Sequence, residues 1–141
     1  MGAAVAGACV LAWLTVLGAY DICMRRLPNW LTLPGAIVIL VVAAATGRGG
    51  HAVVGAVALA GVYLVVHLIA PAAMGAGDVK LALGVGALTA SFGFDVWTLA
   101  AVGAPLLTAA WALVVVRRQR TVPHGPSMCL ATLAAAMLAI V

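Results

Sequence analysis

The sequence predicts an all-helical, polytopic membrane protein with about six transmembrane helices. Of its 141 residues, 67% are hydrophobic and only 7% are charged. The mean hydropathy is +1.27, and a water-soluble domain of this length could not keep such a composition in solution. Polar and glycine-rich connections divide the chain into six apolar runs. They cover residues 2–20, 31–46, 52–70, 79 to about 90, 96–116 and the last stretch up to 141.

The first apolar run, residues 2–20, is long enough to cross a bilayer core of about 30 Å. A signal peptide carries basic residues before its apolar run, whereas here no basic residue precedes Arg25. We therefore expect a retained helix whose C-terminal end faces the cytoplasm. Pro28 disfavours helical geometry in the residue before it. The helix is expected to end at Leu27, with Asp21 in its last turns.

The second and third runs are separated by a glycine-rich turn at residues 47–51. The second run is short for a span, and Pro34 is expected in its first turn, where a missing N–H is tolerated. The third run ends before Pro71 and contains His67. No second ligand lies at a suitable spacing from His67, so we expect it to pack or hydrogen-bond between helices rather than bind a metal.

Turns with distinct signals divide the last three runs. Asp95 directly precedes the fifth run and is expected to be its N-cap, a position that Asp strongly prefers. Arg117, Arg118 and Arg120 follow the fifth run. The segment Pro123-His124-Gly125-Pro126 then introduces the sixth run, which completes a single domain over residues 1–141.

The basic residues predict how the chain lies in the membrane. The net charge is +4, but the six arginines and one lysine lie in the gaps between apolar runs. This pattern indicates membrane anchoring rather than nucleic-acid binding. The first, third and fifth connections hold every basic residue except Arg48. By the positive-inside rule these connections are cytoplasmic and both termini are extracytoplasmic, which predicts a multi-pass protein of the cytoplasmic (inner) membrane in contact with the lipid bilayer.

Two of the three acidic residues lie at the same predicted membrane boundary. Asp78 follows Gly75-Ala76-Gly77 where the chain enters the fourth run, and Asp21 ends the first run. Acidic side chains within membrane segments are costly and usually functional. Two carboxylates in one site cannot both ionise easily, so one can act as a base on water while the other donates a proton to a carbonyl. Alternatively, Asp21 forms an exposed ion pair with Arg25, which would contribute little to stability.

Gly75 and Gly77 are expected to serve the same site as substrate-binding residues. Glycine lets the backbone before Asp78 adopt strained conformations and lets a substrate backbone approach closely. A peptide bond inside a helix is protected by the hydrogen bonds of that helix, so a substrate would have to be locally extended. A glycine-rich opening beside an aspartate could pair with such an extended segment.

Three motifs occur along the chain: Asp21 followed by Arg26-Leu27-Pro28-Asn29, then Gly75-Ala76-Gly77-Asp78-Val79-Lys80-Leu81, then Pro123-His124-Gly125-Pro126. In this combination and order, nearly the whole chain resembles the type IV prepilin peptidase family of intramembrane aspartyl proteases. The resemblance implies that Asp21 and Asp78 are the catalytic pair. It also implies that the substrate is a prepilin or pilin-like precursor, whose leader is cut on the cytoplasmic side after a small residue, usually glycine.

Lys80 belongs to the second of these motifs and is a candidate substrate-binding residue, although an ordinary snorkelling anchor is the favoured interpretation. Neither a metal nor another cofactor is expected. The partners that the resemblance implies are the precursor substrate and a pilus or type II-like secretion machinery.

The chain departs from the family pattern in two places. Many bacterial members have an additional N-terminal region with a cysteine-paired cytoplasmic loop and also methylate the new N-terminus. Cys9, Cys23 and Cys129 are widely spaced and form no CxxC pair, so we expect a short, peptidase-only form without N-methyltransferase activity. His124 stands where the family usually has an aromatic residue. A structural role in the loop is favoured over a pH-dependent role.

Functions from other classes are also compatible with membrane aspartates. A small proton-coupled transporter uses such residues, but it usually places them in the middle of a span rather than near one interface. A non-catalytic assembly factor for a pilus or secretion system could keep the fold and would tolerate replacement of either aspartate. Other proteases with a Gly-x-Gly-Asp motif lack the Pro-Asn and Pro-x-Gly-Pro context found here.

Overall fold

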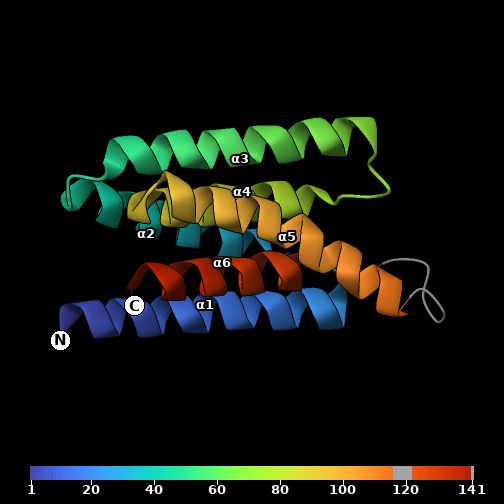
Figure 1. The fold of residues 1–141 in the computed structure, drawn as a ribbon, viewed down its shortest axis with the longest axis horizontal. Helices are drawn as coiled ribbons and strands as arrows, with labels where there is room; N and C mark the ends of the chain where they lie inside the picture. The colour runs from blue at the N-terminus through green and yellow to red at the C-terminus, as the bar shows by residue number, and fades with distance from the viewer. Residues whose placement is uncertain (116–121, 141) are drawn as a thin grey trace.

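The computed structural model describes residues 1–115 and 122–140, and these residues form six α-helices (Figure 1). The helices are α1 (Gly2–Met24), α2 (Asn29–Ala45), α3 (Gly49–Ile69), α4 (Ala76–Phe92), α5 (Phe94–Val115) and α6 (Gly125–Ile140). The predicted all-helical class is therefore confirmed. By length and composition, α1, α3 and α5 could each cross a membrane. Crossing by all six helices, and the side on which the termini lie, remain predictions.

Successive helices run up and down, so alternate connections meet at opposite ends of the bundle (Figure 1). The α1–α2 and α3–α4 connections lie at one end, together with the last turn of α5 and the first turn of α6. The other two connections and both chain termini lie at the opposite end. Asp21 and Asp78, in the turns beside the first two connections, are therefore at the same end, as the predicted topology requires.

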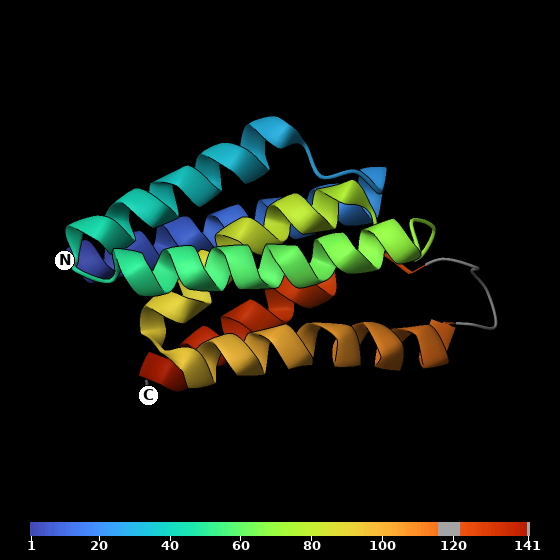
Figure 2. The same cartoon turned by 90° about the horizontal axis from the view of Figure 1, so that it is seen from above.

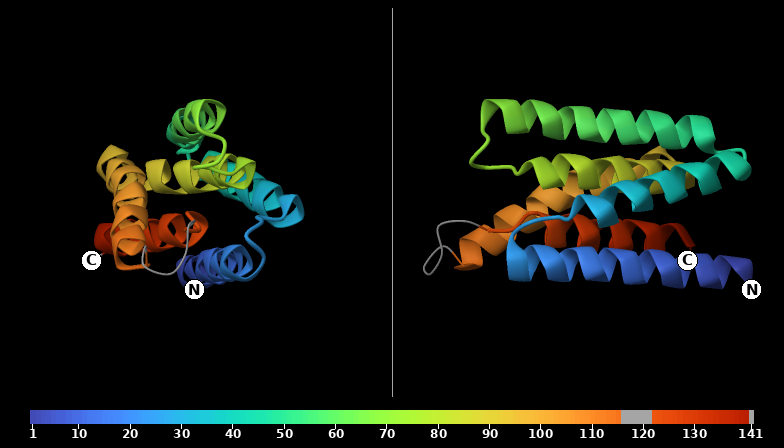
Figure 3. Two further views of the ribbon diagram at one scale, coloured as in Figure 1. Left: turned by 90° about the vertical axis from the view of Figure 1, so that its right-hand side faces the viewer. Right: turned by 180° about the vertical axis from the view of Figure 1, so that it is seen from behind.

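Helix α4 lies at the centre of the bundle and contacts α2, α3, α5 and α6, while α2 and α5 lie at opposite edges (Figures 2 and 3). Its closest approach is to α3, where a Cβ on Gly86 would collide with the backbone of Gly55. The indole N–H of Trp97, on α5, donates to the carbonyl oxygen of Gly55 at 3.1 Å. Small residues that let helix backbones approach are typical of packing in membranes, and here they fix α3, α4 and α5 to one another.

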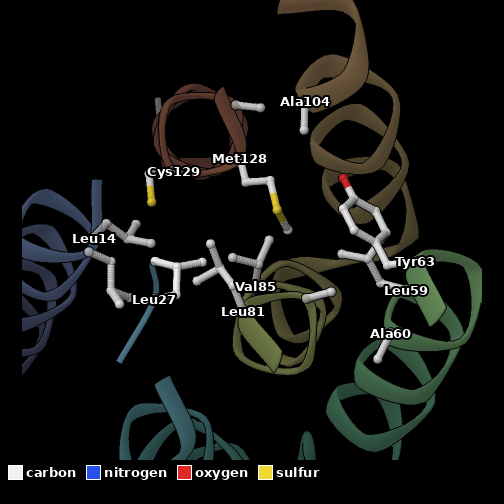
Figure 4. Packing of buried hydrophobic residues seen from close by; sticks show 13 residues of the cluster. Leu14, Leu27, Leu59, Ala60, Tyr63, Leu81, Val85, Ala104, Met128 and Cys129 are labelled. Atoms are coloured by element: carbon white, nitrogen blue, oxygen red, sulfur yellow. The ribbon is translucent and has the colours of Figure 1, made fainter. Parts of the chain in front are cut away.

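The apolar core fills the space between α1, α4 and α6 and reaches α3 (Figure 4). Leu14, Leu81, Val85 and Met128 are almost completely buried there. Large apolar side chains also cover the outside of the bundle, and Leu113 on α5 is 82% exposed. Extensive apolar exposure of this kind is rare on soluble proteins and fits a bundle surrounded by lipid.

Several predicted helix boundaries differ from those of the structure. Helix α1 ends at Met24, before the predicted end at Leu27, because Arg25 adopts the left-handed conformation with φ 50° and ψ 32°. Helix α2 begins at Asn29, so Pro34 lies in its second turn rather than its first.

The predicted N-cap at Asp95 is also wrong. Gly93, with φ 135°, separates α4 from α5, and α5 begins at Phe94, which places Asp95 in the first helical turn. Its negative charge there still faces the positive end of the helix dipole. The predicted cytoplasmic residues Arg117, Arg118 and Arg120 lie outside the described residues.

Candidate active site

A pocket of about 250 Å³ lies at the end of the bundle where the two aspartates are. Its lining includes all five residues that the sequence analysis proposed for the site: Asp21, Gly75, Gly77, Asp78 and Lys80. The remaining lining residues are Arg25, Arg26, Leu27, Asn29 and Ala76. The first two motifs, more than forty residues apart in the sequence, therefore meet in one pocket.

A second pocket, of about 390 Å³, lies between α3 and the α4–α5 connection, at the opposite end of the bundle. His51 and Trp97 line it, but the other lining residues are glycine, alanine, valine and phenylalanine. Although this pocket is larger, His51 is the one acid–base group in its lining, and no second such group or nucleophile lies beside it there. The smaller pocket is the one equipped for chemistry.

The carboxylate of Asp21 is held by a residue far along the chain. Asp21 lies in the last two turns of α1 and is only 7% exposed. Its Oδ2 accepts a hydrogen bond from the backbone N–H of Gly125, at 3.0 Å. A Cβ on Gly125 would lie 2.6 Å from that oxygen, so the contact requires glycine. The charge of Arg25 does act on this carboxylate, but Asp21 is buried, so the pairing is not the fully exposed one that the alternative assumed.

The carboxylate of Asp78 is held by the start of its own helix. Asp78 is the third residue of α4 and is 8% exposed. Its Oδ2 accepts the backbone N–H of Gly75 at 3.2 Å, and its own N–H donates to the Gly75 carbonyl oxygen at 3.1 Å. An acidic side chain at this position satisfies an N–H that the helix leaves unpaired and faces the positive end of the helix dipole.

A model of the type IV leader peptidase family matches residues 8–141. The chain belongs to this family. The match confirms the family predicted from the three motifs and identifies a leader-peptidase-like protease. No curated protein and no solved structure matches the chain significantly.

In this leader peptidase, neither glycine before Asp78 has a strained backbone, and Gly77 provides space for a neighbouring segment. Gly75 has φ −76° and ψ 153°, an ordinary extended conformation, and Gly77 lies within α4. The expectation of a strained backbone is therefore wrong. A Cβ on Gly77 would lie 3.0 Å from the Cβ of Leu27. Gly77 thus lets the α1–α2 connection pack directly against the beginning of α4.

Lys80 connects the second motif to the first. Its ammonium group donates to the side-chain oxygen of Asn29 at 2.8 Å, which joins the second turn of α4 to the first residue of α2. Both residues line the pocket. In this structure the ammonium group is therefore held at the pocket rim by a partner from the peptidase itself, and its contact with substrate remains a prediction.

The third motif is fixed by a buried hydrogen-bond network that the sequence analysis missed. The His124 ring is 9% exposed, and its Nε2 lies 2.9 Å from the hydroxyl of Tyr63 on α3. Its Nδ1 pairs with the hydroxyl of Thr108 on α5. The Thr108 hydroxyl donates its hydrogen to the Ala104 carbonyl oxygen, so the Thr108 oxygen must accept the hydrogen bond from His124 Nδ1–H. In a neutral ring the other nitrogen, Nε2, is then an acceptor, and the Tyr63 hydroxyl donates to it.

This network gives His124 the structural role that was favoured from the sequence. Burial lowers the pKa of His124 to about 4, so the ring is neutral at pH 7. The sequence carried one signal for its partner, because Tyr63 places a hydroxyl inside an otherwise apolar run, four residues before His67. His67 Nδ1–H donates to the Met74 carbonyl oxygen at 2.7 Å, which confirms its predicted hydrogen-bonding role.

Proposed function

We propose that this protein is a membrane aspartyl endopeptidase that removes the leader peptide from type IV prepilins or pilin-like precursors at the cytoplasmic face of the membrane. The observation that supports the proposal best is the pair of buried carboxylates in one pocket. Asp21 and Asp78 come from helices distant in sequence, and each accepts one glycine N–H. Acidic side chains buried among apolar helices are rare and usually mark a functional site.

The pair can hydrolyse a peptide bond if the two carboxylates share one proton, as closely placed carboxylates do. The ionised carboxylate accepts a proton from a water molecule, whose oxygen then attacks the scissile carbonyl carbon. The protonated carboxylate gives its proton to the carbonyl oxygen, which yields a tetrahedral diol. When the C–N bond breaks, the carboxyl group that took the proton from water gives it to the amide nitrogen. The other carboxylate takes a proton from one hydroxyl of the diol, so the pair again shares one proton. The glycine N–H groups keep each carboxylate oriented through these steps.

We propose that Gly75, Gly77 and Lys80 contact the extended segment of the precursor. The pocket opens at the helix ends, where Arg25, Arg26 and Lys80 surround the carboxylates. For Lys80 to bind substrate, its ammonium group must share or exchange its bond to Asn29. The processed pilin or pilin-like protein would then pass to a pilus or type II-like secretion machinery. The mature N-terminus is expected to stay unmethylated.

The test is cleavage of a co-expressed prepilin by the wild type and by Asp21→Asn and Asp78→Asn. Asp95→Asn is a matched control, because it makes the same change at an exposed carboxylate at the other end of the bundle. We expect both pocket variants to lose cleavage at normal membrane levels, and the control to stay active. Cleavage by either pocket variant would exclude the aspartyl mechanism, and absence of cleavage by the wild type would favour transport or assembly roles.

A further inference from the structure

The two carboxylates of the pocket are held in the same way, although they lie in different helices. Each Oδ2 accepts one backbone N–H from a glycine, Gly125 for Asp21 and Gly75 for Asp78. A single N–H donor can orient a carboxylate only if its own backbone is fixed. Whatever fixes the backbone at Gly125 and Gly75 therefore sets the orientation of each carboxylate.

The residue before each glycine is tied to helix α3. Before Gly75, the Met74 carbonyl oxygen accepts a hydrogen bond from His67. Before Gly125, the His124 ring accepts a hydrogen bond from Tyr63, and the two rings are in contact with centroids 5.5 Å apart. Figure 4 shows the Tyr63 hydroxyl pointing away from α3 toward α5. Both connections to α3 therefore end one residue away from a glycine that holds an aspartate.

Tyr63 and His67 lie four residues apart, so their side chains project from the same face of α3. Helix α3 provides none of the pocket residues. Its two side chains instead bond the residues that precede the glycine donors of both carboxylates. Among the residues that the structure describes, the pocket lining includes neither these two nor His124. Their effect on a substrate would therefore be indirect.

We propose that Tyr63 and His67 are positioning residues of the peptidase, which aim the Gly125 and Gly75 N–H groups at the aspartate pair. The inference rests on the proposed catalytic role of Asp21 and Asp78. Without the Tyr63 hydroxyl, the buried Nε2 of His124 loses its donor, and the start of α6 can shift. Without the His67 donor, the α3–α4 connection is released at Met74. Either change misaligns one carboxylate, and small misalignments slow catalysis strongly.

The test measures kcat and KM for a purified prepilin substrate, per folded enzyme. Tyr63→Phe and His67→Leu each remove one hydrogen bond, so we expect kcat to fall about five- to thirty-fold, with KM within about twofold of the wild type. His67→Asn keeps a donor near the position of Nδ1 and should restore most of kcat. Thr108→Val and Thr108→Ser give a second matched pair on the other side of His124, in case Tyr63→Phe does not accumulate.

Combined variants distinguish positioning from a general loss of stability. Tyr63→Phe and Thr108→Val break the same network at His124, so their double variant should lose less than the product of the single losses. Tyr63→Phe and His67→Leu release different carboxylates, so their losses should multiply. A lower thermal midpoint with kcat unchanged per folded molecule, or a rise in KM alone, would contradict the inference.

The aspartate variants separate this inference from the proposed function. If Asp21→Asn and Asp78→Asn are inactive while Tyr63→Phe and His67→Leu keep the wild-type kcat, only the inference is overturned. If either aspartate variant still cleaves the precursor, the proposed function fails and the inference fails with it.

Discussion

Acidification is predicted to destabilise the fold through His124. The ring is buried and neutral, and burial lowers its pKa from an ordinary 6.5 to about 4. Above pH 6.5, His124 is neutral in both the folded and the unfolded chain, so its full contribution to stability is present. As the pH falls from about 6.5 to about 4, the unfolded chain takes up a proton that the folded chain does not. Stability is lost across this range, and the loss is complete below it.

The size of the effect follows from the two pKa values. A tenfold difference in proton affinity corresponds to about 1.4 kcal/mol, so the lowering at His124 corresponds to about 3 kcal/mol of unfolding free energy. Tyr63 and Thr108 are the groups that face the two ring nitrogens. Neither offers a negative charge that could stabilise a protonated ring near neutral pH.

The assay is reversible unfolding of the detergent-solubilised protein by added SDS, followed by fluorescence of its four tryptophans. Wild type and His124→Phe are compared between about pH 7.5 and about pH 4, because phenylalanine keeps a ring but takes up no proton. All other titrating groups are common to both proteins, so the difference between their unfolding free energies isolates His124. We expect this difference to move by about 3 kcal/mol against the wild type on acidification. If the unfolding free energies of the two proteins changed by the same amount with pH, the reasoning would be refuted.

The remaining predictions concern close packing and one hydrogen bond. Gly125→Ala places a Cβ 2.6 Å from the Asp21 carboxylate oxygen and should reduce prepilin cleavage about 100-fold per folded molecule; near-normal cleavage would contradict this contact. Gly86→Ala should destabilise the bundle by about 1–3 kcal/mol in the SDS assay, whereas Gly61→Ala, whose Cβ would meet nothing within 4 Å, should not. Trp13→Phe removes an indole N–H that donates to a backbone carbonyl of α2 at 2.9 Å, and the same assay should show a loss of about 1 kcal/mol.

The sequence was sufficient to predict the helices and the shared pocket. Apolar runs separated by proline, glycine and charge define helices through local composition, and all six were found in order. The basic residues placed the first and third connections on one side, which puts Asp21 and Asp78 at the same end of the bundle. The three motifs together indicated the family. Each of these signals is local, or depends only on the order of elements along the chain.

The helix ends and the buried network depend on information that the sequence does not display. Helices usually end in a left-handed residue that is glycine or asparagine, so nothing in the sequence marked Arg25 for this conformation. The contact between Tyr63 and His124 joins residues 61 positions apart and follows only from how the whole bundle places α3 relative to the start of α6. Gly77 was expected to permit strain, but glycine serves close packing equally well, and only the neighbouring Leu27 distinguishes the two uses.

Helix α3 is connected to both sides of the proposed catalytic pair. Its Gly55 packs closely against Gly86 of α4, the helix that carries Asp78. Through Tyr63 and His67 it reaches the backbone that holds each carboxylate. A displacement of α3 would therefore disturb both glycine donors at once. On this argument, Gly86→Ala should lower kcat as well as stability, because the added methyl group forces apart the two helices whose packing sets the geometry of the pair.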